Sequence, residues 1–169
     1  MGSKCVFVDR DGVINKDYVD YVYSLEKLEI LPGVTESLFK LKETGYLIIV
    51  ITNQSGIAQG IYQREDMRLC HEAIQEQCSY SIEAFYYAPW HPSVTESLTR
   101  KPDSLLFEKA IAKYDIDVQY SWMVGDKDRD LIPAKKLGLK TIQVDHSDSS
   151  NADYKKADLA AAVALILGR

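Results

Sequence analysis

The chain has little cysteine. Cys5, Cys70 and Cys78 are the only three in 169 residues, their number is odd, and no CxxC pair occurs. This usage excludes a disulfide-stabilised secreted scaffold and is typical of a reduced compartment. We therefore expect a cytoplasmic protein.

Long apolar runs and an excess of basic charge are also missing. The longest strongly apolar run, Leu159 to Leu167, is far shorter than the ~20 residues of a membrane-spanning helix. The residues from Met1 to Lys4 lack the apolar stretch of a signal peptide. With 20 basic and 25 acidic residues the net charge is −5, which offers no general attraction to nucleic acid or anionic lipid. We expect no membrane and no nucleic-acid partner.

Short apolar runs alternate with helical patterns along the whole chain. This alternation predicts an α/β fold, a three-layer Rossmann-like parallel sheet flanked by helices, in one domain over residues 1–169. The predicted strands are 5–8, 46–51, 82–88, 122–124 and 141–144, and helical spacing occurs at 34–41, 67–78, 106–111, 131–137 and 157–167. Segments 10–32 and 89–102 fit no element and follow strand ends. We expect these two loops to shape a substrate site, because ligands bind beyond the carboxyl ends of parallel strands.

The first predicted strand runs directly into two aspartates, Asp9 and Asp11. If Asp9 ends the strand and Asp11 lies in the turn, both carboxylates face one point. One could attack phosphorus while the other transfers a proton. A turn rich in Asp and Gly explains the same residues.

Two further strings suggest phosphate contacts. Thr52 and the residues up to Ser55 form a polar cluster directly after the second strand, where a hydroxyl and backbone N–H groups can hold phosphate oxygens. Arg100 and Lys101 precede the helix that begins near Ser104 and could bind a phosphoryl group. A strand-end turn and a solvated basic pair are the alternative interpretations.

The fourth predicted strand also ends in carboxylates. Asp128 is explained as a helix N-cap and Asp130 as first-turn charge, whereas Asp126 occupies the same strand-end position as Asp9. In a parallel sheet Asp9, Thr52 and Asp126 reach one edge. Carboxylates gathered there repel unless a cation lies among them, and oxygen ligands beside a phosphate suit Mg²⁺. The pattern therefore predicts a Mg²⁺-assisted phosphoryl-transfer site.

Taken in their order along the chain, the four strings resemble the motifs of the haloacid dehalogenase (HAD) superfamily of phosphatases. These motifs are DxD, a strand-end Thr, a Lys and GDxxxD. The fuller strings are DRDGVIN at 9–15, TNQSGIAQG at 52–60, RKP at 100–102 and VGDK at 124–127. They resemble the histidinol-phosphate and D-glycero-D-manno-heptose 1,7-bisphosphate phosphatase branch.

The resemblance implies a role for each matching position. Asp9 would be the nucleophile that forms an aspartyl-phosphate, and Asp11 the acid and later the base. Thr52 and Lys101 would stabilise the transferring phosphoryl group. Mg²⁺ would bind to Asp9, the backbone carbonyl of Asp11 and Asp126. The implied substrate contacts are Arg10, Asp17, Tyr18, Val19, Asp20, Asn53, Gln54, Ser55, Arg100 and Lys127.

One stretch departs from the pattern of the branch. Many members carry a zinc loop that reads CxHxP, completed by CxC before RKP. Here the corresponding segments are 88–92 and 97–99, with Ala88, Ser97 and Thr99 at cysteine positions and His91 one place out of register. We expect no zinc, and we expect His91 to be a surface or loop-packing residue.

The resemblance implies a phosphoric monoester hydrolase acting on a sugar bisphosphate, with the 7-phosphate of heptose 1,7-bisphosphate as the expected target. No insertion is long enough for a separate cap domain. A monomer is expected. Histidinol phosphate and a polynucleotide 3′-phosphate are the rival substrates. A phospho-accepting receiver module, which also uses aspartates, Thr and Lys, is the alternative from another class.

Overall fold

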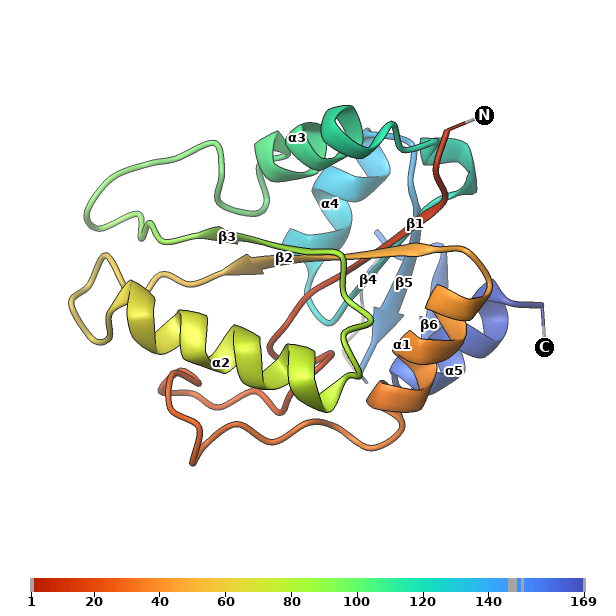
Figure 1. Ribbon diagram of the computed structural model, residues 1–169. Coiled ribbons are helices and arrows are strands. Elements are labelled where there is room, and N and C mark those ends of the chain that lie inside the picture. Colours follow the sequence, from red (N-terminus) through yellow and green to blue (C-terminus); the bar gives the residue numbers. More distant parts are fainter. Residues whose placement is uncertain (1, 146–148, 150, 169) are drawn as a thin grey trace.

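The computed structural model describes residues 2–145, 149 and 151–168, and its centre is a six-stranded, fully parallel β-sheet (Figure 1). The strand order is β3-β2-β1-β4-β5-β6. The elements are β1 (Cys5–Val8), α1 (Val34–Glu43), β2 (Leu47–Asn53), α2 (Arg64–Gln77), β3 (Ala84–Ala88), α3 (Leu105–Tyr114), the 3₁₀ helix η1 (Val118–Tyr120), β4 (Trp122–Gly125), α4 (Asp128–Lys136), β5 (Lys140–Val144), β6 (Tyr154–Lys156) and α5 (Leu159–Ile166).

Helices cover both faces of the sheet. Apolar side chains of α1, α2 and α5 pack on one face around Val6 and Val8, and those of α3 and α4 pack on the other around Phe7 (Figure 1). Because both faces are covered, all four residues of β1 are buried, which explains the continuous apolar run in the sequence. The predicted three-layer α/β fold is confirmed.

The order of the strands places a crevice beside β1. The chain continues from β1 to β2 and β3 on one side of it, then crosses to β4, β5 and β6 on the other. Ligands bind at such a switch point, at the carboxyl ends of the strands. The long segments 10–32 and 89–102 leave from the carboxyl ends of β1 and β3, and they contain turns and isolated bridges.

Three details differ from the sequence prediction. The edge strand β6 and the 3₁₀ helix η1 were not predicted, because they are short and polar. The N-cap of α4 is Lys127, and Asp128, which was predicted as the N-cap, is the first helical residue.

No helix among the described residues has the length and apolar character needed to cross a membrane.

A buried histidine lies on α2, outside the crevice. His71 stacks on Phe85 with ring centroids 4.5 Å apart, and its Nε2 is buried without a hydrogen-bond partner. Burial, with a smaller contribution from the charge of Arg10, lowers the pKa of His71 to about 3. The imidazole is therefore neutral in the folded protein at neutral pH.

This histidine makes the fold sensitive to acid. The unfolded chain binds a proton near pH 6.5 and the folded chain near pH 3, so stability is complete above pH 6.5 and falls between these values. At pH 5 the loss from His71 is about 2 kcal/mol. Urea unfolding at pH 8 and pH 5 should show this extra loss in the parent protein and not in His71→Gln. Parallel losses in the two proteins would contradict the prediction.

Candidate active site

The site is built at the carboxyl end of β1. Asp9 directly follows this strand, its N–H donates to the Val124 carbonyl (3.1 Å), and its side chain is buried. The chain then turns at Gly12, whose φ of 86° lies in the left-handed region. A Cβ at this position would lie 2.5 Å from Asp126 Oδ2, so only glycine lets the turn approach Asp126 this closely.

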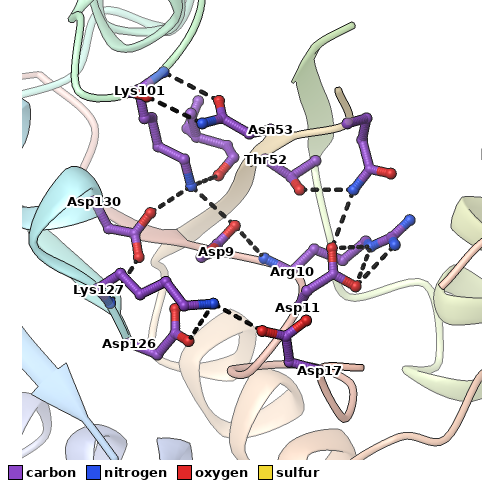
Figure 2. Close-up of polar contacts among 12 residues, drawn as sticks. Asp9, Arg10, Asp11, Asp17, Thr52, Asn53, Lys101, Asp126, Lys127 and Asp130 are labelled. Atoms are coloured by element: carbon purple, nitrogen blue, oxygen red, sulfur yellow. Dashed lines mark hydrogen bonds and ion pairs between the residues drawn. The ribbon is translucent and has the colours of Figure 1, made fainter. Parts of the chain in front are cut away.

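Lys101 reaches the centre of the crevice from the loop before α3. Its Nζ lies 2.9 Å from Asp9 Oδ1 and 2.6 Å from Asp130 Oδ1, and it donates to the Ile51 carbonyl at 2.6 Å (Figure 2). Burial lowers the pKa of Lys101, but Asp130 and Asp9 outweigh it and raise this pKa above its ordinary value. The ammonium therefore stays charged although it is buried.

Asn53, at the end of β2, holds the backbone of this lysine. Its side-chain amide donates to the Lys101 carbonyl and its amide oxygen accepts from the Lys101 N–H, both at 3.0 Å. This reciprocal pair fixes the loop to the sheet, so the lysine side chain enters the site in one orientation. Asn53 thus positions Lys101.

Three buried carboxylates surround one point. Asp9, Asp126 and Asp130 each offer an oxygen within 4.8 Å of the others, the one such ligand group found among the described residues. Burial, followed by the charge of Asp130, raises the pKa of Asp9 to about 7 and that of Asp126 to about 6. Bringing these negative charges together is unfavourable, and a divalent cation would relieve the repulsion. The oxygen-only donor set fits Mg²⁺.

Asp11 belongs to a separate polar network. Arg10 donates to both of its carboxylate oxygens, at 2.8 to 3.2 Å (Figure 2). Asn15 and Gln54 add one hydrogen bond each. Burial alone would raise the pKa of Asp11, but these partners lower it below its ordinary value. In this conformation Asp11 is an ionised carboxylate.

Thr52 lies at the same edge, on β2. It is buried, and its hydroxyl accepts a hydrogen bond from Gln54 Nε2 at 2.9 Å. Gln54 in turn accepts from the Tyr62 hydroxyl at 2.7 Å. The amide thus links Thr52 to Asp11 and holds two of the predicted catalytic side chains in a fixed relation.

A cavity of about 260 Å³ opens above these groups. Its lining residues are Asp11, Asp17, Tyr18, Val19, Tyr21, Asn53, Ser55, His91, Arg100 and Arg129. Six of the predicted substrate contacts are therefore brought together, from both long loops and from the end of β2. Lys127 joins them indirectly, because its Nζ pairs with Asp17 (2.7 Å) and with Asp126 (3.2 Å).

Three predicted contacts lie elsewhere. Asp20 is on the surface and pairs with Lys27 at 2.6 Å. Arg10 and Gln54 are buried beneath the cavity and are bound to Asp11. In this structure they position another side chain and do not line the space open to a substrate.

Four side chains in this region were not among the predicted site residues. Tyr21 and His91 line the cavity, and Arg129 and Asp130 lie in the first turn of α4. Asp130 accepts a hydrogen bond from the Lys127 N–H (3.1 Å) at the start of α4, which agrees with its interpretation as first-turn charge. It also forms an ion pair with Lys101. The available signal was its place as the second Asp of the GDxxxD motif, four residues after Asp126. Arg129 stands between two aspartates in the sequence, so the pattern did not indicate it as a site residue.

A buried carboxylate at the end of the central strand, a buried lysine beside it and three carboxylates that could hold a cation are the arrangement expected of a HAD-type phosphatase site. The comparisons with known proteins agree. Residues 98–166 match the family model described as "HAD-hyrolase-like". The heptose-1,7-bisphosphate 7-phosphatase of Haemophilus ducreyi, named for the β-anomer, is 36% identical over 94% of this chain and 93% of its own length. That of Burkholderia mallei, named for the α-anomer, is 36% identical over 83% of this chain and 79% of its own length.

A solved structure gives the same result. The D,D-heptose 1,7-bisphosphate phosphatase of B. bronchiseptica, crystallised with magnesium and phosphate, superimposes with a TM-score of 0.89 at 25% identity and covers 98% of both chains. The chain therefore belongs to the heptose-1,7-bisphosphate 7-phosphatase family of HAD-like hydrolases. It is a phosphoric monoester hydrolase.

Proposed function

We propose that this chain removes the 7-phosphate of D-glycero-D-manno-heptose 1,7-bisphosphate, with Asp9 as the nucleophile and Mg²⁺ as the cofactor. The observation that carries the proposal is the convergence of Asp9, Lys101 and Asp126 at the switch point of the sheet. The names of the relatives support the sugar, and the magnesium and phosphate of the solved relative support the chemistry.

The residues that would hold the cation are Asp9, Asp126 and the backbone carbonyl of Asp11. Asp130 adds a third carboxylate close by. When bound, Mg²⁺ would neutralise the charge on the phosphate and leave Asp9 able to approach an anion. The remaining chemistry is supplied by side chains of the protein.

In the first step a carboxylate oxygen of Asp9 forms a bond to phosphorus as the bond to the sugar oxygen breaks. Lys101 and Thr52 stabilise the charge on the transferring group, and Asp11 gives a proton to the leaving oxygen. In the second step Asp11 takes a proton from a water molecule, which attacks the aspartyl-phosphate and releases phosphate and Asp9.

The protonation of Asp11 has to change for this sequence to run. Arg10 keeps its carboxylate ionised in the structure. A dianionic phosphate arriving beside it would raise the pKa of Asp11 by like-charge repulsion, so the acid would form when substrate is bound. The pairing with Arg10 suits the later step, in which Asp11 acts as a base.

The substrate panel and the metal requirement can be tested together. Released phosphate would be measured with heptose 1,7-bisphosphate, histidinol phosphate and a 3′-phosphorylated oligonucleotide. We expect the highest kcat/KM with the heptose, and loss of activity in EDTA that returns with Mg²⁺, because the three carboxylates then regain their counter-charge. A higher kcat/KM with histidinol phosphate or the oligonucleotide, or full activity in EDTA, would contradict the proposal.

The monomeric state, the cytoplasmic location and the absence of zinc stay predictions, as does the division into one domain with two substrate loops. In the structure His91 lines the cavity, and its Nδ1 lies 2.7 Å from the Ser93 hydroxyl.

A further inference from the structure

A buried tyrosine lies behind the catalytic groups, away from the space open to a substrate. Tyr62 stands between β2 and α2 and is only 5% exposed. Its hydroxyl donates a hydrogen bond to Gln54 Oε1 at 2.7 Å. Tyr62 does not contribute to the wall of the active-site cavity, so a substrate bound there does not touch it. Any effect of this hydroxyl on the reaction has to pass through Gln54.

The ring of Tyr62 is held in place by its neighbours. Tyr23 stacks on it with ring centroids 5.0 Å apart, and Tyr21 meets it edge-on at 5.8 Å. Gly56 lies so close to the ring that a Cβ at this position would collide with it. A ring packed on several sides has few alternative positions. The phenol hydroxyl is therefore presented to Gln54 from one fixed direction.

This hydroxyl determines which way the Gln54 amide faces. Burial raises the pKa of Tyr62, so the phenol keeps its hydrogen and can donate it to the amide oxygen. The amide nitrogen then faces the opposite side, where it donates to Asp11 Oδ2 at 3.1 Å and to Thr52 Oγ1 at 2.9 Å. The oxygen and both hydrogens of the amide are thus in use. An ionised Asp11 only accepts, so it favours the same orientation.

The orientation of the amide decides what the Thr52 hydroxyl can do. A hydroxyl has one hydrogen to donate and two lone pairs that accept. Because Gln54 Nε2 donates to Thr52 Oγ1, the hydrogen of Thr52 stays available for a phosphoryl oxygen. With the amide reversed, Gln54 Oε1 would face Thr52 and accept that hydrogen. A donor that already points at the transferring group stabilises its charge without reorganisation during the reaction.

We propose that Tyr62 is a positioning residue, which holds Gln54 in the orientation that lets Thr52 donate its hydrogen to the transferring phosphoryl group. This inference rests on the proposed function for the role of Thr52. Without the phenol hydroxyl, the buried oxygen of Gln54 loses its donor, and leaving such an acceptor unsatisfied is unfavourable. The Thr52 hydroxyl is a donor within reach of a rotated amide, so its hydrogen is then shared between Gln54 and the substrate.

The test is Tyr62→Phe, which keeps the ring and its stacking and removes only the hydroxyl. We expect kcat to fall by about 5- to 20-fold, and by the same factor on p-nitrophenyl phosphate and on heptose 1,7-bisphosphate. KM should stay within about twofold, because Tyr62 touches neither substrate. Tyr23→Phe is the matched control. It makes the same chemical change in the stacked ring, whose hydroxyl lies outside the hydrogen bonds that join Tyr62 to Thr52, and should leave kcat and KM unaltered.

A double-mutant cycle separates positioning from a purely structural role. Thr52→Val keeps the shape of the side chain and removes the hydrogen that Tyr62 is inferred to direct. In this background Tyr62→Phe should change kcat by less than about twofold, because both substitutions remove the same interaction. All variants are assayed well below their measured Tm, so that a smaller folded fraction does not imitate a lower kcat.

Three results would overturn the inference. These are a kcat of Tyr62→Phe within twofold of the parent, a loss confined to KM, and an equal loss of kcat in the parental and Thr52→Val backgrounds. The proposed function fails in a different way. A parent enzyme that hydrolyses p-nitrophenyl phosphate but not the heptose bisphosphate would refute the assigned sugar, whereas the cycle measured with p-nitrophenyl phosphate would still decide the role of Tyr62.

Discussion

Replacing Asp9 by Asn is expected to lower kcat for phosphate release by about 10⁴-fold, because the amide cannot form the bond to phosphorus. The fold should survive the change. Asp9 is buried beside two further carboxylates, and Asn has nearly the same shape without the charge. In EDTA at pH 8 the variant should therefore unfold at the same temperature as the parent or at a higher one.

Two measurements make this test decisive. Stopped assays of released phosphate give kcat, and thermal unfolding in EDTA gives Tm for the same preparation. Asp103→Asn is the matched control, since it makes the same chemical change at an exposed position before α3. A variant at Asp9 that keeps a tenth or more of the parental rate with the parental Tm would show that the nucleophile lies elsewhere.

Replacing Lys101 by Met is expected to damage both stability and catalysis. The lysine is the buried partner of Asp9 and Asp130, so its loss leaves two carboxylates without their counter-charge. Breaking a buried ion pair in this way costs about 3–5 kcal/mol, which urea unfolding in EDTA would measure. We expect kcat to fall by about 10²- to 10³-fold, because a cation aimed at the transferring group is also removed.

A second substitution separates the two effects. In the double variant Lys101→Met with Asp130→Asn, one uncompensated carboxylate is gone, so part of the lost stability should return while kcat stays low. Lys109→Met, at an exposed position on α3, controls for the change of charge and should leave both quantities unaltered. Parental stability of the single variant at Lys101 would refute the ion-pair account.

The fold was predictable because its signals are local. β1, β2 and β4 are apolar on both faces, so each reads as a continuous hydrophobic run. β6 has no such signal. Its residues Tyr154, Lys155 and Lys156 are polar and largely exposed at the edge of the sheet, and pairing with β5 is what makes them a strand.

The site was predictable to a different extent for different side chains. Asp9, Thr52 and Asp126 follow apolar runs directly, so parallel pairing was enough to place them at one edge. Asp130 and Arg129 were not predicted as site residues. Both stand in the first turn of α4, where an acidic side chain is explained by the helix dipole. A single basic residue between aspartates gives no pattern that indicates a site.

The sequence by itself determined the layers of the fold, the strand ends that carry the carboxylates and the class of chemistry, because each depends on neighbours along the chain. The tertiary structure decided which charges meet. Lys101 pairs with Asp9 and Asp130, which lie about 90 and 30 residues away along the chain. Arg10 binds the carboxylate of Asp11, and Arg129 shares a cavity with Arg100. Such pairings depend on how the loops cross the sheet edge, and electrostatic forces act through space whatever the separation in sequence.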